Sequence, residues 1–338
     1  MRKGQNPAKA GVKAYIPKKL GIASLVSIPV LQGYFEHSLE IFKIHLASIH
    51  QYTAEPFDLV VFDNGSCAEV KNELVKMNGN GLINTLILSE HNLGKTAALN
   101  HLLGSMSNEW ICFADSDMLF RSGWLEACWK INESFPGCGM IGAQVVFPDW
   151  VEDKGNTVFR KNHDGKFQIT QEKVLPWIVR EYITGRGINE KRARFYTDML
   201  LDKVTNSDTG VEAFMGGNSH QQFLGPRDKL LQLLPLPSGL QLSREQDTYQ
   251  DRRLDELGCL HLTTTVPYLY HMGNTVDPEI VLEVNKIQRN VSAEMLVKSK
   301  AWRKNNLGWK FLVRLYRYQP TRRMLLRLYN NLYEIISN

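Results

Sequence analysis

Short apolar runs alternate with helical patterns along most of the chain, starting near residue 21. The runs have the length of β-strands, and the segments between them repeat apolar residues at the spacing of an amphipathic helix. The predicted strands are Ile22–Val30, Phe57–Phe62, Leu82–Leu88, Trp110–Ala114, Gly139–Phe147 and Leu260–Val266. The predicted helices are Tyr34–His50, 67–77, 94–105, 226–234 and 243–257. This alternation favours an α/β fold with a mostly parallel central sheet flanked by helices.

Polar residues follow two of these predicted strands directly. The turn Asp63-Asn-Gly-Ser66 ends one strand, and Asp115-Ser-Asp117 ends another. Ligands of parallel α/β sheets bind beyond the carboxyl ends of the strands, so both clusters are expected on the same rim of one sheet. Asn-Gly is also an ordinary turn signal, so the first cluster fits equally a plain turn or an Asp that hydrogen-bonds a base or ribose.

Asp115 and Asp117 are two residues apart, so on extended backbone their carboxylates point the same way. Two like charges there repel unless they share a cation, and hard oxygen ligands suit Mg²⁺ or Mn²⁺. A turn in which one Asp caps the helix after Ser122 explains the triplet equally well. Its position at a strand end has to decide between the two interpretations.

The stretch His91–Thr96 contains Gly-Lys-Thr, which resembles part of a phosphate-binding loop. The full motif needs a glycine at position 89, where the chain has Ser89. A P-loop triphosphatase is therefore excluded, and Asn92 and Lys95 remain as polar residues near the sheet rim.

Two acids, Glu245 and Asp247, lie at the start of the helix predicted at 243–257. The helix dipole stabilises acids there, so they are either structural or one of them is a general base. His271 follows a late strand and is either a hydrogen-bonded core histidine or a third ligand of a metal bound by Asp115 and Asp117.

The composition indicates a globular protein, with 338 residues of which 43% are hydrophobic. The five cysteines are scattered without a C-x-x-C pair, which favours reduced thiols in a cytosolic protein. The Lys-rich start contains no apolar signal region, and no segment approaches the roughly 18 apolar residues of a membrane span. We expect a cytoplasmic protein.

The charge is uneven along the chain. Residues 298–338 carry ten Lys or Arg against one acid and residues 1–19 carry six against none, which leaves 24 basic and 34 acidic residues in the body. An acidic body argues against nucleic-acid binding. The basic segment 298–338 has an amphipathic pattern, which fits the inner face of an anionic membrane or packing on the acidic body equally well.

Taken in order, these features resemble the GT-A nucleotide-sugar glycosyltransferases, most closely the inverting family 2. The resemblance covers residues 21–275. It rests on a first strand that ends in Ile-Pro-Val, then on Asp63-Asn-Gly-Ser66, Asn92-x-Gly-Lys95 with Ala98 and Asn100, Asp115-Ser-Asp117, Gly216-Gly217, the acid pair leading to Arg253 and Gly258, and His271.

The resemblance implies a metal-dependent glycosyltransferase that moves a sugar from a nucleotide-diphosphate sugar, most commonly a UDP-sugar, to a saccharide or lipid-linked acceptor. It implies a Mn²⁺ or Mg²⁺ ion on Asp117 and His271, and a base at Asp247. The residues implied in nucleotide-sugar binding are Pro29, Val30, Asp63, Asn92, Lys95, Asp115, Ser116 and Gly217. The family pair Glu-Asp is Gln246-Asp247 here, so Glu245 is an alternative base.

Three segments are expected: a basic segment 1–20, a GT-A domain 21–275 and a helical basic extension 276–338. Within the domain, the polar stretch 148–206 is expected to be an irregular, loop-like excursion over the rim. Its aromatic and basic residues Trp150, Trp177, Tyr182 and Arg186 are expected to shape the acceptor pocket. The alternatives are a retaining GT-A transferase, a haloacid-dehalogenase-type phosphohydrolase and a non-catalytic interaction module.

Overall fold

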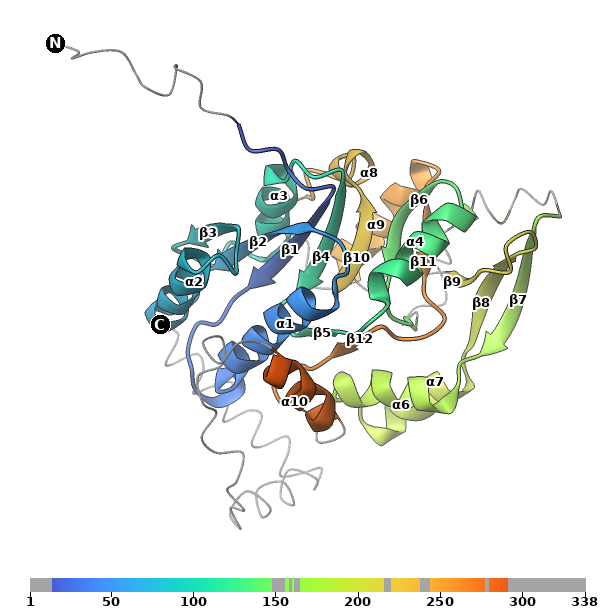
Figure 1. Ribbon diagram of the computed structural model, residues 1–338. Helices are drawn as coiled ribbons and strands as arrows, with labels where there is room; N and C mark the ends of the chain where they lie inside the picture. Colours follow the sequence, from blue (N-terminus) through green and yellow to red (C-terminus); the bar gives the residue numbers. More distant parts are fainter. Residues whose placement is uncertain are drawn as a thin grey trace. The chain divides into compact units, whose positions relative to one another are not determined.

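The structure, a computed structural model, describes residues 14–147, 156–157, 160, 165–215, 220–237, 244–276 and 280–290. All of them belong to the first of the two units into which the chain divides, Met1–Ser292 and Ala293–Asn338. Within these residues the chain forms an α/β fold around one ten-stranded sheet (Figure 1). Both predicted basic segments, 1–20 and 276–338, lie largely outside the described residues.

The first half of the sheet is parallel, as the alternation predicts. Its strands, in the spatial order β3-β2-β1-β4, are Thr85–Ser89, Phe57–Asn64, Leu20–Val26 and Trp110–Asp115. The connecting helices are α1 (Ser38–Tyr52), α2 (Ala68–Gly79) and α3 (Lys95–Ser105). Val26 pairs with Asp63, and Leu25 pairs with Asp115, so the carboxyl ends of three strands meet at one rim.

The second half of the sheet is largely antiparallel, so the sheet as a whole is mixed. After β4 the order continues β10-β6-β11-β9-β8-β7, with bounds Gln222–Pro226, Cys138–Gly142, Leu260–Thr263, Glu212–Met215, Leu200–Asn206 and Phe167–Lys173. Strand β10 runs antiparallel to both β4 and β6. Its first residues therefore lie beside the last residues of β4, at the same rim as Asp115.

Alternate residues of the central strands feed two cores, one on each face of the sheet. In β1, Ile22 and Val26 belong to one core and Ala23 and Leu25 to the other, as the two-residue period of a strand requires. The first core also receives side chains from α1, α2 and α4 (Trp124–Ser134), and the second receives side chains from α3, α8 (Arg227–Leu231) and α9 (Arg244–Glu256).

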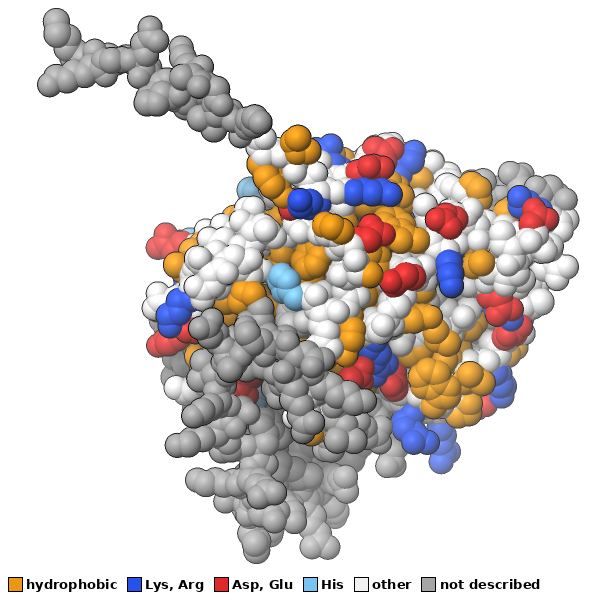
Figure 2. Space-filling model, viewed as in Figure 1, with side chains coloured by type: hydrophobic (Ala, Val, Ile, Leu, Met, Phe, Trp, Pro, Cys, Tyr) orange, Lys and Arg blue, Asp and Glu red, His pale blue; other side chains and the backbone are white. Residues whose placement is uncertain are grey.

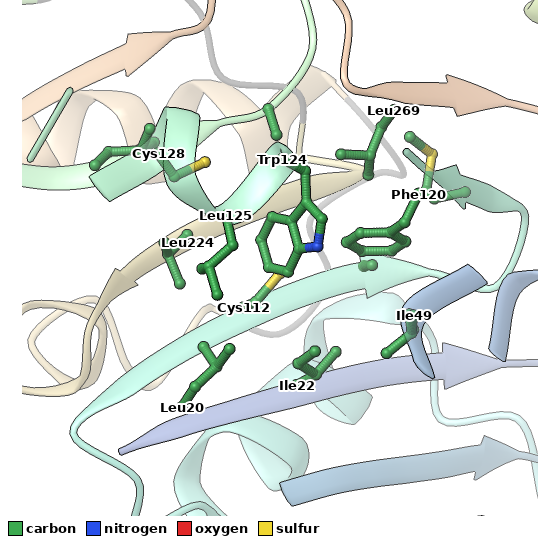
Figure 3. Packing of buried hydrophobic residues seen from close by; sticks show 14 of the residues in the cluster. Leu20, Ile22, Ile49, Cys112, Phe120, Trp124, Leu125, Cys128, Leu224 and Leu269 are labelled. Carbon is green, nitrogen blue, oxygen red and sulfur yellow. The ribbon is translucent and has the colours of Figure 1, made fainter. Parts of the chain in front are cut away.

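Trp124 anchors the first core. Its indole is fully buried and meets Phe120 edge to face, with ring centroids 5.0 Å apart. Figure 3 shows the ring between the central strands and Leu269, with Cys112 beside it. This packing fixes the chain immediately after the Asp115–Asp117 turn against the sheet.

A second, two-stranded sheet follows that turn. It pairs β5 (Met118–Phe120) with β12 (Leu269–His271), and His271 is opposite Met118. The sequence patterns did not predict β5, because three residues are too few to show a strand period. This pairing brings His271 beside Asp117.

Residues 165–206 are regular rather than irregular, which corrects the expectation of a loop-like excursion over 148–206. They form β7, α6 (Pro176–Gly185), α7 (Glu190–Asp198) and β8, and their buried side chains make a separate core. In α7 charged residues outnumber apolar ones, and in α6 the exposed Trp177 interrupts the pattern, so the sequence shows no clear helical period there. Figure 2 shows hydrophobic side chains gathered over α6 and α7, where Trp177 and Phe195 are exposed.

Arg121, directly after β5, links two helices to this part of the fold. Its guanidinium group forms paired hydrogen bonds with Glu181 of α6 and Glu283 of α10 (Val281–Asn290).

Helix α9 ends as predicted, with Gly258 at a φ of 68°. The described residues contain no helix that is long and apolar enough to span a membrane.

Candidate functional site

Lys95 and Asp115 form the centre of the polar rim. Lys95 begins α3, and its Nζ lies 2.8 Å from Oδ2 of Asp115 at the end of β4. The same ammonium group donates to the backbone carbonyl of His220, 3.3 Å away. Burial raises the pKa of the Asp115 carboxyl, and the Lys95 cation opposes that shift. The predicted neighbours Lys95 and Asp115 are thus in direct contact.

Asp117 and His271 form the second pair of the rim. Oδ2 of Asp117 lies 3.3 Å from Nε2 of His271, and the two chain segments are tied by a backbone hydrogen bond from Met272 to the Asp117 carbonyl. Nδ1 of His271 donates to the Gly185 carbonyl at 2.8 Å, which leaves Nε2 free of its proton in the neutral ring. Among the described residues, Oδ1 of Asp117 is buried without a hydrogen-bond partner.

Gly185, at the end of α6, permits this arrangement. A Cβ atom there would lie 2.4 Å from the backbone oxygen of His271, well inside van der Waals contact. Only glycine therefore allows α6 to approach β12 closely enough for its carbonyl to hold the His271 ring. The sequence alone did not distinguish Gly185 from its neighbours.

The turn after β2 is locked to the loop before α3. Nδ2 of Asn64 donates to Oδ1 of Asn92 at 3.0 Å, and Oδ1 of Asn64 accepts from the Leu93 backbone at 2.7 Å. Gly65 has a φ of 76°, and a Cβ atom there would lie 2.5 Å from the Asn92 backbone nitrogen. The Asp-Asn-Gly-Ser motif is therefore a turn built to seat Asn92.

Asp63 is completely buried at this turn. Both its carboxylate oxygens lie 3.3 Å from the Ser66 amide, and burial raises the pKa of its carboxyl. These contacts are those of the plain turn interpretation. Pro29 and Val30 lie nearby in the loop after β1 and are exposed, and Ser116 lies half-buried in the turn between Asp115 and Asp117.

Asp247 lies in the first turns of α9 with its side chain 37% exposed. Burial of part of this carboxyl raises its pKa, and the nearby His220 opposes the rise. Nδ1 of His220 lies 3.9 Å from Oδ1 of Asp247. Since Lys95 bonds the His220 carbonyl, a continuous chain of contacts connects Asp115 with Asp247.

A cavity opens beside His271. Four polar residues line it together with apolar side chains from α6 and β12; they are Gln144, Glu181, Tyr182 and Arg186. The Arg186 guanidinium stacks over the Tyr182 ring at 3.9 Å from its centroid and donates to Gln221. Of the aromatic and basic residues predicted for an acceptor pocket, Tyr182 and Arg186 thus line a cavity, whereas Trp177 lies exposed elsewhere on α6.

Three predicted residues are not described at the level of their side chains. Gly217 and Trp150 lie outside the described residues, and Glu245 is described only as a backbone position of α9. The sequence patterns also missed a polar cluster that begins beside Asp247, formed by the buried His220 and His261 and the partly exposed Asp251. Asp251 had a signal, since it is one helical turn after Asp247. The two histidines had none, because only the sheet brings them there.

Comparison with solved structures yields distant similarities. The mannosyltransferase PcManGT from Pyrobaculum calidifontis, in complex with GDP-Man and Mn²⁺, is 14% identical with a TM-score of 0.42, over 75% of this chain and 58% of that chain. TarS 1–349 of S. aureus in complex with UDP is 16% identical with a TM-score of 0.43, over 80% and 64%. This chain therefore spans less than two thirds of either one.

No curated protein matches the chain. Among protein families, residues 38–191 match the model of "Glycosyl transferase family 2". The match includes the turn at Asp63, the Asn92–Lys95 segment and Asp115–Asp117, in the order that supported the resemblance. Residues 38–191, a little under half of the chain, are therefore similar to the family 2 glycosyltransferases.

Proposed function

We propose that this protein transfers a sugar from a nucleoside-diphosphate sugar to an acceptor hydroxyl with the help of a divalent metal. The observation that carries the proposal is the gathering of charged side chains from three distant segments at one sheet rim: Lys95 of α3, Asp115 and Asp117 after β4, and Asp247 of α9. Lys95 bonds both Asp115 and the His220 backbone, and the His220 ring faces Asp247. Asp117 completes the rim beside Asp115. In such a site the Lys95 cation can contact a phosphate group, and the Asp247 carboxylate can accept a proton.

Asp117 and His271 fit a divalent metal. Nε2 of His271 and Oδ2 of Asp117 face each other at 3.3 Å, and Oδ1 of Asp117 has no hydrogen-bond partner among the described residues, so a cation bound here would have an imidazole nitrogen and a carboxylate as ligands. The backbone carbonyl on Nδ1 is a common outer partner of metal-binding histidines. Mn²⁺ accepts this mixture of nitrogen and oxygen ligands. When bound, the metal would stabilise the charge of the diphosphate leaving group.

We assign the donor nucleotide to the rim between the β1 loop and Asp115. Three residues are exposed there, namely Pro29, Val30 and Asn92. The Lys95 ammonium group would contact a diphosphate either by breaking its hydrogen bond to Asp115 or by bonding both groups at once. Asp63, Ser116 and Gly217 complete the proposed set. PcManGT and TarS were solved with GDP-Man and UDP, so a guanosine and a uridine donor are both candidates.

Asp247 is our candidate for the general base, with Glu245 as the alternative. A base must reach the acceptor proton, and the Asp247 side chain is partly exposed at the rim. Attack by the acceptor oxygen opposite to the leaving diphosphate would invert the anomeric configuration. The acceptor, a saccharide or a lipid-linked saccharide, would enter near the cavity with Tyr182 and Arg186.

Thermal unfolding with nucleotides tests the proposal. We expect a panel of UDP, GDP and TDP to contain one that raises Tm in the presence of Mn²⁺ and raises it much less with EDTA. Asp117→Ala should remove the Mn²⁺ dependence. Asp228→Ala is the matched control, because that carboxylate is exposed on α8.

Three results would count against the proposal. Absence of any nucleotide effect favours the non-catalytic interaction module. An unchanged Mn²⁺-dependent shift in Asp117→Ala excludes the assigned metal site. Release of phosphate from phosphate monoesters, without nucleotide binding, would favour the phosphohydrolase. If binding is established, the anomeric configuration of the isolated product distinguishes inverting from retaining transfer.

A further inference from the structure

Two buried histidines and the partly exposed Asp251 form a cluster beside Asp247 that has no part in the proposed function so far. His220 comes just before β10, Asp251 is on α9, and His261 is in β11. The histidines are 5% and 1% exposed. Among the described residues, neither imidazole ring has a hydrogen-bond partner of ordinary geometry for its nitrogens. Burial of such groups is unfavourable unless charges compensate for it.

Carboxylates provide that compensation. Nε2 of His220 and Nδ1 of His261 each lie 3.4 Å from Oδ1 of Asp251. On its other side, Nδ1 of His220 faces Oδ1 of Asp247 at 3.9 Å. These separations exceed those of ordinary hydrogen bonds, so we regard them as ion pairs. The order in space is Asp247, His220, Asp251, His261.

His220 is therefore a buried imidazole between two carboxylates. A neutral ring would offer a proton to only one of them, whereas an imidazolium has an N–H for each. Its backbone is held separately, because its carbonyl accepts from Lys95. Desolvation and the Lys95 cation lower the pKa of His220, but the carboxylates of Asp251 and Asp247 outweigh them and raise it. In turn, although desolvation opposes this, the two histidines hold the pKa of Asp251 well below its usual range.

We propose that Asp251, supported by His261, holds His220 as a cation beside Asp247, so that His220 is a positioning residue that orients the candidate base and keeps it ionised. The proposal rests on the function proposed above. Without such a cation, Asp247 would have the carboxylates of Asp251 and Asp115 as its nearest charges, balanced only by Lys95. Proton uptake before the reaction would then be favoured, and a protonated Asp247 is not a base.

The proton balance of the transfer is simple. The acceptor O–H bond breaks and its proton moves to Asp247 while the acceptor oxygen bonds the anomeric carbon. The bond from that carbon to the diphosphate breaks, and the electron pair leaves with the diphosphate. His220 keeps both its protons throughout, so Asp247 becomes neutral beside a cation and readily loses the new proton to solvent.

Histidine NMR tests the inference without any substrate. In ¹³C-histidine-labelled protein, with the His220 signal assigned by His220→Gln, we expect His220 to titrate above the ordinary midpoint of about 6.5. Asp251→Asn should lower this midpoint by at least about one unit, equivalent to a tenfold change in proton affinity. Glu256→Gln, an exposed charge removal on the same helix, should leave it unchanged.

Reciprocal coupling provides a second variant in case Asp251→Asn does not fold. If His220 stabilises the Asp247 anion, then removal of that anion in Asp247→Asn must also lower the His220 midpoint. Asp247 is more exposed than Asp251, so this variant is the easier one to fold. A His220 that is neutral at pH 6.5 in the wild type, or a midpoint that neither variant changes, overturns the proposal.

The pH profile of catalysis separates this inference from the proposed function. We expect the acid limb of donor hydrolysis to move to higher pH in Asp251→Asn, with about a tenfold loss at pH 6 that higher pH restores. Nucleotide affinity should not change. A uniform loss at every pH would indicate a merely structural role. Failure of all nucleotides to bind would refute the proposed function while the NMR result stands by itself.

Discussion

The ammonium nitrogen of Lys95 lies 2.8 Å from Oδ2 of Asp115 and 3.3 Å from the carbonyl of His220. One side chain thereby joins the start of α3, the end of β4 and the segment before β10. The ammonium group also lies over the ring of Phe113, 5.5 Å from the ring centroid. These contacts hold Lys95 in place, which would lower the entropic cost of the diphosphate contact that we propose for it.

Replacement of Lys95 by Met keeps the length of the side chain and removes the charge. We expect the affinity for the preferred nucleoside diphosphate to fall about tenfold, or about 1.4 kcal/mol, because a charge-assisted contact is lost. Isothermal titration calorimetry measures this. Lys76→Met, in an exposed pair with Glu73, is the control. Unchanged nucleotide affinity in Lys95→Met would show that Lys95 serves only to neutralise Asp115.

Gly185→Ala tests how α6 holds His271, the proposed metal ligand. The new Cβ would lie 2.4 Å from the His271 carbonyl oxygen, so α6 and β12 must separate. We expect the free energy of unfolding to drop by about 1–3 kcal/mol, the usual cost of overpacking. The Mn²⁺ dependence of nucleotide binding should weaken at the same time.

The matched control for that variant is Gly104→Ala in α3. A Cβ atom there meets nothing within 4 Å, and alanine is the better helix former. Urea unfolding should find this variant as stable as the wild type or more so. If Gly185→Ala is equally harmless and keeps the Mn²⁺ effect, then the Gly185 carbonyl does not orient His271.

His45 should make stability depend on pH. It is fully buried in α1 between Ser24 and the Met118 carbonyl, and burial lowers its pKa to about 4. Between the unfolded value near 6.5 and this folded value, the unfolded chain binds a proton that the folded chain does not. The free energy of unfolding should therefore fall as pH decreases through this window, by about 2 kcal/mol from this group at pH 5.

Urea unfolding of wild type and His45→Gln at pH 7, 6 and 5 measures that contribution. The variant should start less stable at pH 7, and its stability should change less between pH 7 and 5. His101→Gln, an exposed replacement on α3, should keep the wild-type slope. Parallel pH slopes for wild type and His45→Gln would show that His45 does not titrate in the window.

The local order of strands, helices and turns could be predicted from the sequence. Strand β2 begins at Phe57 and β4 at Trp110, and α3 ends at Ser105, all as the patterns indicate. These elements have clear two-residue or helical periods and glycine or polar residues at their ends. The patterns failed in α7, where charged residues outnumber apolar ones, and in α6, where an exposed Trp177 interrupts the apolar spacing.

The roles of Asp115, Asp117 and Asp247 were predicted from motif order and remain proposals, since motif order carries no distances. The tertiary structure decided which residues lie beside them. His271 lies beside Asp117 because β12 pairs with the three-residue strand β5, and His220 lies at the end of β4, beside Lys95, because β10 runs antiparallel to β4. Strand pairing is a long-range contact that neither partner encodes alone. By itself the sequence determined which elements form and which chemical groups end them; the sheet decided which of those groups meet.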